Sequence, residues 1–496
     1  MIARQSFFNT ITIGLAFIIG ALNTIYFYPT YLGSELQGLV VALLAISNLI
    51  QPIISFGVQH SLIKFFSSCK NKIEKDSLFL FSMVFPIIIF LTIILPLSLL
   101  FSDEIIELIS AKNKIMGKYL FMILAISFST AYFEVFYSWS RVNMKTIFGN
   151  FLKEFYPRAL VFSLLIIYAF NFIDFDLFVL LLIGGYYFRL LLMLVYSLNI
   201  YRPSLTFTLP NNFKKVFRYS LIIFLSGSAA SLILDIDKSM ISNYLTIENV
   251  AYYSVAIFIA AVIEIPGRAM IQIVNPIVAK LINENHNKRL ISLLKKTSNN
   301  LLLVSGLFFL IIILNLNDFY VWSNLHEYKS AIEVVYIVSL AKLFSISLGC
   351  LNNIITNSKY YVYVFWFSII SAFLAVFLNY YLIPLNGIIG AALATLIVVV
   401  LINLGKLILI QIKYKANPYN FKTILSVLLI GIVYFLIITL KPETFIDNIS
   451  NPNPIYNISF RSFLIAGIYV LLAYFFGLTK DFQEAVLRFR QKRIDR

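Results

Sequence analysis

Long apolar stretches separated by short polar segments run along the whole chain. A helix that crosses a bilayer needs about 20 consecutive apolar residues, and these stretches repeatedly reach that length. The pattern predicts fourteen membrane-spanning helices, so the expected fold class is an all-α, polytopic membrane protein. The predicted helices cover residues 8–31, 38–58, 78–101, 119–139, 155–173, 177–199, 219–243, 250–274, 300–317, 331–351, 361–383, 387–411, 423–440 and 460–478.

Composition supports this reading. Hydrophobic residues make up 60% of the 496 residues and charged residues only 12%, whereas globular proteins are roughly half apolar and a quarter charged. The net charge of +16 does not indicate a nucleic-acid partner, because the cations lie in short loops between apolar stretches, where they act as topology signals. Cys69 and Cys350 fall in or near predicted cytoplasmic segments, so no disulfide framework is expected. The first apolar stretch has no small-residue cleavage site, which favours a retained helix.

The distribution of Lys and Arg predicts the orientation. With the N-terminus in the cytoplasm, the predicted cytoplasmic segments contain 27 of the 39 Lys and Arg residues. The predicted outer segments are acidic, as in Asp103, Glu104, Glu107, Asp174 and Asp176. Positive charge accumulates on the cytoplasmic side of membrane proteins, so both termini are expected to be cytoplasmic.

Two of the cytoplasmic segments are basic and amphipathic. Apolar residues recur at helical spacing among cations in segment 281–297 and in the C-terminal tail around 482–493. Helices of this kind lie on anionic membrane surfaces, so we expect both segments to contact the anionic inner leaflet. A simpler interpretation, that the cations act only as topology signals, is compatible with this one.

Enzymatic motifs are missing from the sequence. No outer loop exceeds roughly 20 residues, the span of a single transmembrane helix, which leaves no room for an outer catalytic domain. There is no phosphate-binding loop of the G-x-x-x-x-G-K-[ST] type. His60, His286 and His326 are isolated from one another and have no metal-ligand spacing. We therefore expect neither enzymatic activity nor a metal or other cofactor.

A short motif recurs in the two halves of the chain. Tyr31-Leu32-x-x-Glu35 reappears as Tyr244-Leu245-x-x-Glu248, and each copy is followed by a proline within the next apolar stretch, Pro52 or Pro266. Transporters are often built from two similar halves. The expected organisation is an N-lobe at 1–212 with helices 1–6, a C-lobe at 213–416 with helices 7–12, and a segment at 417–496 with two further helices and a basic cytoplasmic tail.

These motifs resemble a known family. YLGSELQG at 31–38 and SFGVQ at 55–59 are similar to the first hairpin of the polysaccharide transporter family, which includes the O-antigen flippases. This family belongs to the multidrug, oligosaccharidyl-lipid and polysaccharide exporter superfamily. Further similar features are Asp237-Lys238, NVAYY at 249–253 and IPLNGIIGAALAT at 383–395. The last is the most specific of them.

The resemblance implies a function. It points to a flippase of the bacterial inner membrane that carries a polyprenyl-pyrophosphate-linked oligosaccharide, such as an O-antigen repeat unit, across the bilayer by alternating access. A polysaccharide polymerase and other assembly proteins are then expected partners. The sequence carries no ATP-binding motif, so an ion gradient is the expected energy source.

Charged residues inside predicted helices are the candidates for the transport site. A charge at mid-bilayer costs at least ~2.5 kcal/mol, so it is a functional candidate by default. Arg189 and Lys342 lie near the middle of their helices without an obvious partner in sequence, and Arg268 and Arg158 lie four residues after a glutamate, where each could form a structural pair on one helix face. We expect these four cations to contribute to a cavity for the pyrophosphate, because arginine and lysine compensate a dense anion.

Three carboxylates are candidates for coupling to an ion gradient. Glu264 lies near the middle of predicted helix 250–274, Asp237 near the outer end of 219–243, and Glu134 in the inner half of 119–139. A change in protonation at one of them would link transport to the gradient. Lys406 lies near the inner end of its helix and is expected to extend to the interface without a role in transport.

Three other functions remain open at this stage. A cation-coupled multidrug exporter of the same superfamily is disfavoured by the excess of central cations, because its cargo is usually cationic. A peptidoglycan-precursor flippase is a close relative with the same expected number of helices. A membrane glycosyltransferase or polymerase is the least favoured, because those families usually carry a large outer loop.

Overall fold

The computed structural model describes residues 2–66, 68–110, 112–204, 209–210, 212–440 and 454–478. All regular elements in these segments are helical, and eleven helices are long and apolar enough to cross a membrane. One of the eleven, α18 (Val362–Tyr414), contains two of the predicted spans joined at Gly387. Two further predicted spans correspond to α10 (Tyr156–Ala169) and α12 (Phe213–Tyr244). All fourteen predicted segments therefore coincide with helices, and the all-α membrane fold is confirmed.

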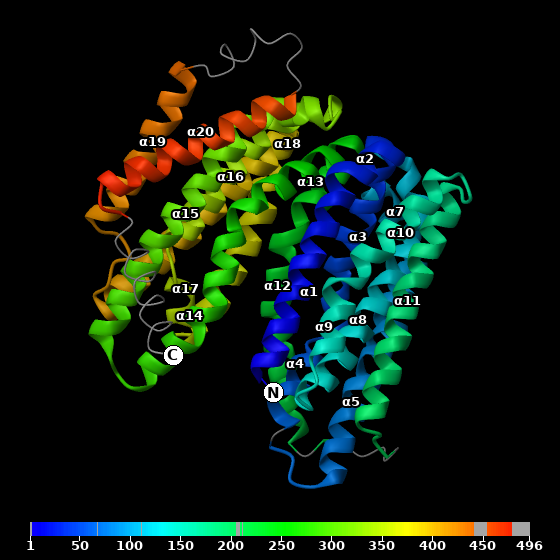
Figure 1. Ribbon diagram of the computed structural model, residues 1–496. Coiled ribbons are helices and arrows are strands. Elements are labelled where there is room, and N and C mark those ends of the chain that lie inside the picture. Colours follow the sequence, from blue (N-terminus) through cyan, green and yellow to red (C-terminus); the bar gives the residue numbers. More distant parts are fainter. Residues whose placement is uncertain are drawn as a thin grey trace. The chain divides into compact units, whose positions relative to one another are not determined.

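The chain forms two compact units, drawn in Figure 1. Unit 1 contains Met1–Ser254 and Ala372–Gly387, and unit 2 contains Val255–Ser371 and Ile388–Arg496. The first unit extends to Ser254, past the predicted lobe boundary at 212/213, because α12 packs along α3 (Gly33–Ser55) in unit 1. The two units are therefore not the two predicted six-helix lobes, and that division stays a prediction.

The remaining helices follow in chain order. Unit 1 contains α1 (Ile2–Leu22), a π-helical turn η1 (Asn23–Phe27), α2 (Tyr28–Tyr31), α4 (Val58–Phe66), α5 (Lys72–Ile89), a π-helical turn η2 (Phe90–Ile94), α6 (Leu95–Leu100), α7 (Ser102–Ser110), a 3₁₀ turn η3 (Lys114–Tyr119), α8 (Leu120–Val142), α9 (Ile147–Glu154) and α11 (Phe175–Ile200). Helix α13 (Glu248–Ala261) continues from unit 1 into unit 2. Unit 2 contains the 3₁₀ turns η4 (Val262–Glu264) and η5 (Glu327–Ala331), and α14 (Ile265–Asn283), α15 (Asn287–Trp322), α16 (Ile332–Ser347), α17 (Leu351–Asn357), α19 (Phe421–Leu440) and α20 (Pro454–Phe475).

The core of unit 1 forms around α3, which packs against both α8 and α12. Close approach on one side depends on Gly38, because a Cβ atom there would lie only 2.0 Å from the backbone oxygen of Ile247. Near the C-terminal end of α8, the ring of Trp139 stacks on that of Phe79 from α5 at 4.0 Å between centroids, and both are fully buried. Aromatic stacking and the exclusion of water stabilise this part of the bundle.

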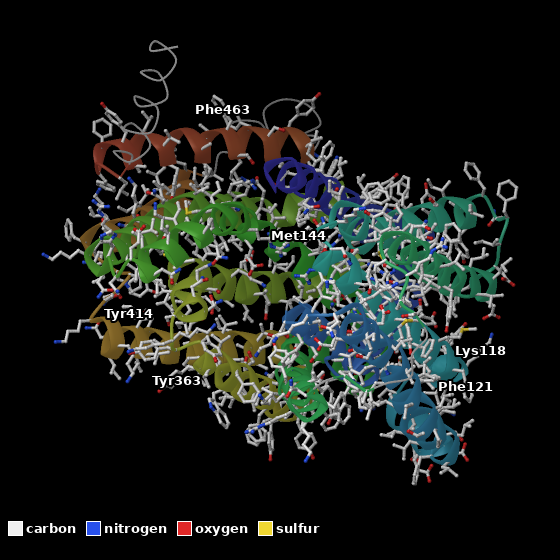
Figure 2. All side chains as sticks on the ribbon, turned by 90° about the horizontal axis from the view of Figure 1, so that it is seen from below. Lys118, Phe121, Met144, Tyr363, Tyr414 and Phe463 are labelled. Carbon is white, nitrogen blue, oxygen red and sulfur yellow. The ribbon has the colours of Figure 1, made fainter. Side chains whose placement is uncertain are left out.

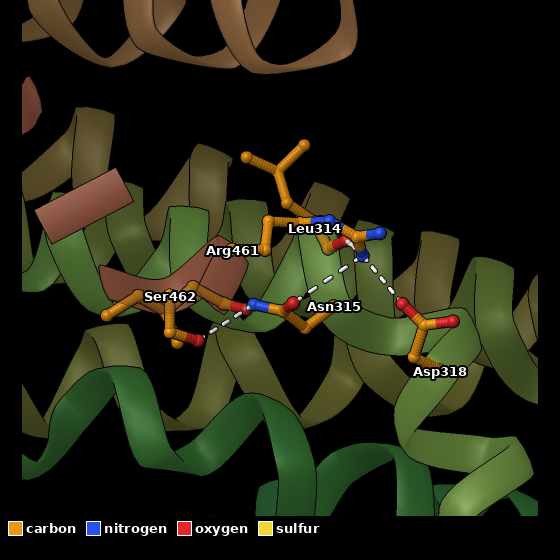
Figure 3. A network of polar contacts seen from close by, with 6 residues as sticks. Leu314, Asn315, Asp318, Arg461 and Ser462 are labelled. Atoms are coloured by element: carbon orange, nitrogen blue, oxygen red, sulfur yellow. Dashed lines mark hydrogen bonds and ion pairs between the residues drawn. The ribbon is translucent and has the colours of Figure 1, made fainter. Parts of the chain in front are cut away.

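The core of unit 2 forms around α15, which packs against α16, α19 and α20. A polar network attaches α20 to α15 within this apolar contact (Figure 3). The guanidinium of Arg461 donates to the backbone oxygen of Leu314 at 2.7 Å and to Asp318 at 2.8 Å, and Asn315 donates to Ser462 at 3.1 Å. The network satisfies a buried cation, which would otherwise be costly in this environment.

Large apolar side chains also cover the outside of the helices. Phe121, Tyr363 and Phe463 project outward in Figure 2, and the exposed fraction of Phe463 is 78%. A water-soluble protein rarely exposes so many large apolar residues together. This surface agrees with helices that face lipid.

Segment 281–297 differs from the expectation of a separate amphipathic helix. Residues from Asn287 onward form the first turns of α15, which continues without interruption to Trp322. Leu290 and Leu294 are buried in the core of unit 2 and pack with Leu351 and Ile354. The apolar face of this segment therefore contacts protein rather than the membrane surface. The predicted tail helix lies outside the described residues.

The ends of neighbouring helices contact each other in pairs that the predicted topology places on the same side of the membrane. Lys118, just before α8, binds Asp176 at the start of α11 at 2.6 Å, and both are predicted to be outer residues. At the opposite ends, the hydroxyl of Tyr201 donates to Asp76 at 2.5 Å, and both are predicted to be near the inner face. The copies of the repeated motif also occupy equivalent places, since Glu35 and Glu248 both lie in the first turn of a helix that follows another.

Candidate functional site

A break between α13 and α14 positions the first candidate carboxylate. Pro266 lies in the first turn of α14 and has no N–H to donate to the preceding turn, so the chain passes through the 3₁₀ turn η4 before α14 begins. Glu264 is the last residue of this turn and the N-cap of α14. The predicted span at 250–274 is thus two helices with Glu264 at their junction.

Two cations bind the two oxygens of Glu264. Lys342 on α16 places Nζ 2.9 Å from Oε1, and Arg268, one turn along α14, places Nη2 3.3 Å from Oε2. The pairing of Glu264 with Arg268 follows from their spacing of four residues, whereas the approach of Lys342 depends on how α16 packs. We call these three residues the Glu264 triad. It carries one negative and two positive charges.

The triad adjoins a cavity of about 350 Å³ in unit 2. Glu264 lines it from η4, Arg268 from α14 and Lys406 from α18. Three asparagines also face it: Asn352, Asn353 and Asn403. A cavity with two cations, one carboxylate and amide groups suits an anionic, hydroxyl-rich ligand, because the cations compensate its charge and amides both donate and accept hydrogen bonds.

An asparagine cluster continues from the wall of this cavity. The Oδ1 atom of Asn275 accepts hydrogen bonds from Asn353 at 2.9 Å and from Asn357 at 2.8 Å. Asn353 is therefore held in place by α14, while Asn352 next to it has no hydrogen-bond partner among the described residues. Asparagine carries no net charge and is not conspicuous in sequence, so this part of the site was not predicted.

Arg189 lies inside unit 1, where only 4% of its surface is exposed. Its guanidinium lies 4.3 Å from the ring centroid of Phe133 and 4.6 Å from that of Tyr186. Its hydrogen bond to Thr130 is long, at 3.4 Å, and its Nε has no partner in the described structure. Cation–π contacts with these two rings thus contribute to the compensation of this charge.

The other unit 1 candidates each pair with a residue at the end of α9. Glu134 binds Lys153 at 2.7 Å, and Arg158 lies 3.5 Å from Glu154. Burial alone would lower the pKa of Lys153, but the charge of Glu134 raises it above the ordinary value. Lys153 therefore stays protonated and Glu134 stays compensated.

Asp237 on α12 is buried and held by neutral donors. The hydroxyl of Tyr253 donates to its Oδ2 at 2.5 Å, and the amide of Asn379 donates to its Oδ1 at 2.6 Å. Its neighbour Lys238 binds Asp235 at 2.8 Å. These contacts connect α12 to α13 and to the first half of α18, which explains why Ala372–Gly387 belongs to unit 1.

The structure thus brings three of the seven predicted site residues together, namely Glu264, Arg268 and Lys342. Arg158, Arg189 and Glu134 occupy unit 1, and Asp237 lies in a separate network there. Over the described residues, no group of three His, Cys, Asp or Glu side chains has the arrangement of a metal site.

Comparisons with known proteins agree with this architecture. The solved structure of lipid II flippase MurJ in an inward closed conformation superposes with a TM-score of 0.68 and 16% sequence identity, over 96% of this chain and 99% of that one. An inward-facing multidrug resistance MATE family transporter of the MOP superfamily gives a TM-score of 0.58 and 14% identity, over 80% of this chain and 95% of that one. At such low identity, these similarities establish a shared fold.

Sequence comparison identifies the family. No curated protein sequence matches the chain. The family model described as polysaccharide biosynthesis protein matches residues 2–268, which is more than half of the 496 residues. The chain therefore belongs to the polysaccharide biosynthesis protein family and has the fold of the MOP exporter superfamily.

Proposed function

We propose that this protein is a flippase that moves a polyprenyl-pyrophosphate-linked oligosaccharide across the bacterial inner membrane. Its family acts in polysaccharide biosynthesis, and it shares a fold with the lipid II flippase MurJ. The observation that carries the proposal is the unit 2 cavity, which is lined by Glu264, Arg268 and Lys406 and whose Glu264 also binds Lys342. The protein is then a transporter rather than an enzyme.

The charges of the cavity favour an anionic cargo. Arg268 and Lys406 line the cavity with two positive charges against the single charge of Glu264, and Lys342 adds a third positive charge where it binds Glu264. A pyrophosphate entering the low-dielectric interior loses its hydration, and arginine and lysine compensate it through short charge-assisted hydrogen bonds. A cationic drug would be repelled from the same cavity, which disfavours the multidrug exporter despite the similarity in fold.

Transport follows by alternating access. The saccharide and the pyrophosphate occupy the polar cavity while the polyprenyl chain stays in the bilayer, so only the polar part of the cargo needs a path. Rocking of the two halves of the chain then exposes the cavity first to the cytoplasm and later to the outer face. Polymerase and assembly proteins would act on the cargo after release.

Asp237, Glu134 and Glu264 remain the three candidates for coupling to an ion gradient. Glu134 and Glu264 bind lysine or arginine side chains, and Asp237 accepts hydrogen bonds from Tyr253 and Asn379. The Asp237 contacts join α12 to α13 and α18, so protonation of this carboxylate would change how these helices are held together. Asp237→Asn should preserve passive exchange and abolish its acceleration by an imposed pH gradient, and unchanged acceleration would exclude Asp237.

The function can be tested with purified protein in liposomes. We expect the wild type to move a fluorescent polyprenyl-pyrophosphate oligosaccharide between leaflets, and Arg268→Ala and Lys342→Ala to slow it by about tenfold or more, since hydrogen bonds to charged groups contribute roughly 1.5–3 kcal/mol. Lys118→Ala is the matched control, because it removes one half-exposed cation that binds Asp176 outside the cavity. Normal flipping by both cavity variants at equal protein levels would contradict the proposed site.

Arg189 and Arg158 provide a second comparison. Arg189 is enclosed by aromatic rings, so it is expected to contribute to transport only if unit 1 opens around it during the cycle. Arg189→Lys keeps the charge but loses the planar fork that stacks on the rings. If charge alone matters, this variant should retain most of its flipping, whereas Arg189→Ala should not. Arg158→Ala removes the pair with Glu154 and keeps Arg189. Comparing its flipping rate with that of Arg189→Ala shows which of the two arginines contributes to transport.

A further inference from the structure

Lys406 is a cation of the unit 2 cavity that stands apart from the Glu264 triad. It lies on α18 eight residues before the helix ends at Tyr414, which corresponds to about 12 Å along the helix axis. That distance is more than an extended lysine side chain spans, so the Lys406 ammonium does not reach the end of its helix, and the residue lines the cavity. The expectation that Lys406 only reaches for the interface is therefore not the best account of its position.

The two cations that line the cavity, Arg268 and Lys406, and the nearby Lys342 differ in how they are compensated. Arg268 and Lys342 each bind an oxygen of Glu264. Lys406 forms no ion pair and no hydrogen bond within the described part of the chain. An uncompensated ammonium in a low-dielectric site costs free energy, and a bound anion would offset that cost. Lys406 is thus the cation whose charge is available to a ligand without displacing an internal partner.

Two amides accompany this charge. Asn403 lies one helical turn before Lys406 on the same face of α18, and it is 7% exposed with no hydrogen-bond partner among the described side chains. Asn352 lines the cavity from α17, and its side chain also has no hydrogen-bond partner among the described residues. Each side-chain amide can donate two hydrogen bonds to an oxyanion. An ammonium with two free amides is a reasonable coordination set for phosphate or carboxylate oxygens.

We propose that Lys406, Asn403 and Asn352 form a binding subsite for an oxyanion of the cargo, either a phosphate of the pyrophosphate or the carboxylate of an acidic sugar. This inference rests on the proposed function and adds to it the residues that make the first contact. The anion binds Lys406 first, because Arg268 and Lys342 are each already bound to an oxygen of Glu264, whereas Lys406 has no ion-pair partner among the described residues. Glu264 then competes with the anion for those two cations, which favours release of the cargo after transport.

The test uses the full-length protein in detergent and measures binding of three probes. These are polyprenyl pyrophosphate without sugar, the same lipid with a neutral oligosaccharide, and the same lipid with an oligosaccharide that contains a uronic acid. We expect Lys406→Met to weaken binding about tenfold and Lys406→Arg to keep it within about threefold. Lys413→Met is the matched control, since Lys413 lies on the same helix but does not line the cavity.

The pattern over the probes identifies the anion. Equal weakening for all three probes by Lys406→Met supports a phosphate as the partner, and weakening only for the acidic probe supports a carboxylate. Unchanged binding of every probe by Lys406→Met, while the wild type binds, would overturn the subsite and leave the proposed function intact. If the wild type itself binds none of the three lipids, the proposed function fails.

Stability separates a binding role from a structural one. Since Lys406 has no partner in the described structure, replacing it with methionine should leave the thermal unfolding midpoint unchanged or raise it. Asn403→Leu should behave in the same way, with weaker binding and no loss of stability. A fall in the midpoint for Lys406→Met, together with restored binding once the variant is stabilised by lipid, would show that Lys406 supports the fold and would refute the subsite.

Discussion

At the scale of single residues, the buried contact between Arg461 and Asp318 shows how this bundle accommodates charge. The Arg461 side chain is 6% exposed and that of Asp318 is 25% exposed. The guanidinium also donates to a backbone oxygen of α15, so the pair is part of a larger network. Such a pair contributes little compared with an apolar contact of the same volume, but removing one partner leaves the other charge without compensation.

We expect Asp318→Asn to lower the free energy of unfolding by roughly 3 kcal/mol, because the buried guanidinium of Arg461 would lose its ion pair with Asp318. The combination of Asp318→Asn with Arg461→Met should be more stable than Asp318→Asn alone, since neither charge is then present. Chemical denaturation in detergent measures both. If the single and double variants have equal stability, the two side chains are not coupled and the network has no energetic role.

Single residues also show what sequence reasoning can and cannot predict about the site. A charge inside an apolar stretch is conspicuous, so Glu264, Arg268 and Lys342 could be selected from their positions alone. The contact between Lys342 and Glu264 could not, because the apolar pattern of a helix does not specify which neighbour it meets. The cavity beside Lys406 could not be predicted for a related reason. The sequence gives the distance of this residue from the end of its helix, but not the side chains that surround it.

At the scale of elements, periodicity located the helices but not their continuity. The apolar stretches were long enough for all fourteen predicted segments to coincide with helices. The break at η4 and the extension of α15 down to Asn287 depend on local packing and on Pro266, and neither changes the average apolarity of the segment. In sequence, Leu290 and Leu294 fit a membrane-facing stripe as well as a buried one, because a protein core and a lipid surface select the same residues.

The kink in α18 gives a prediction about an element. Gly387 has φ 60° and ψ −140°, a conformation that is open to glycine and costs other residues roughly 1–3 kcal/mol. A Cβ atom there would contact only Leu245, at 3.9 Å, so the cost of Gly387→Ala is in the backbone. We expect this variant to lower the unfolding midpoint and to slow flipping, because the kink joins segments that belong to different units.

Gly431 on α19 is the control for this prediction. It lies within a regular helix and a Cβ atom would meet nothing within 4 Å. Gly431→Ala should therefore leave stability unchanged or raise it by up to about 1 kcal/mol, as alanine does in helices. Equal behaviour of the two glycine variants would indicate that α18 straightens at no cost and that the kink is not required.

At the scale of the whole molecule, the predicted topology sets the side from which cargo enters. The loops near Lys70 and Lys288 are rich in cations and are expected to be cytoplasmic, whereas those near Lys114 and Ser330 are expected to be outside. In this orientation α18 ends at Tyr414 on the cytoplasmic side, and Lys406 lies between that end and the middle of the membrane. Cargo made in the cytoplasm would then reach Lys406 before Glu264.

Single-cysteine labelling tests this topology in both units. In a background of Cys69→Ser and Cys350→Ala, we place one cysteine at Ser68, Lys114, Lys288 or Ser330, each of which is exposed to solvent. A membrane-impermeant maleimide should label Lys114→Cys and Ser330→Cys in intact spheroplasts, and Ser68→Cys and Lys288→Cys only after permeabilisation. Labelling of Lys288→Cys in intact cells, with Ser68→Cys still protected, would mean an odd number of crossings between them. The unit 2 cavity would then face the opposite way, and loading of the cargo through Lys406 from the cytoplasm would be excluded.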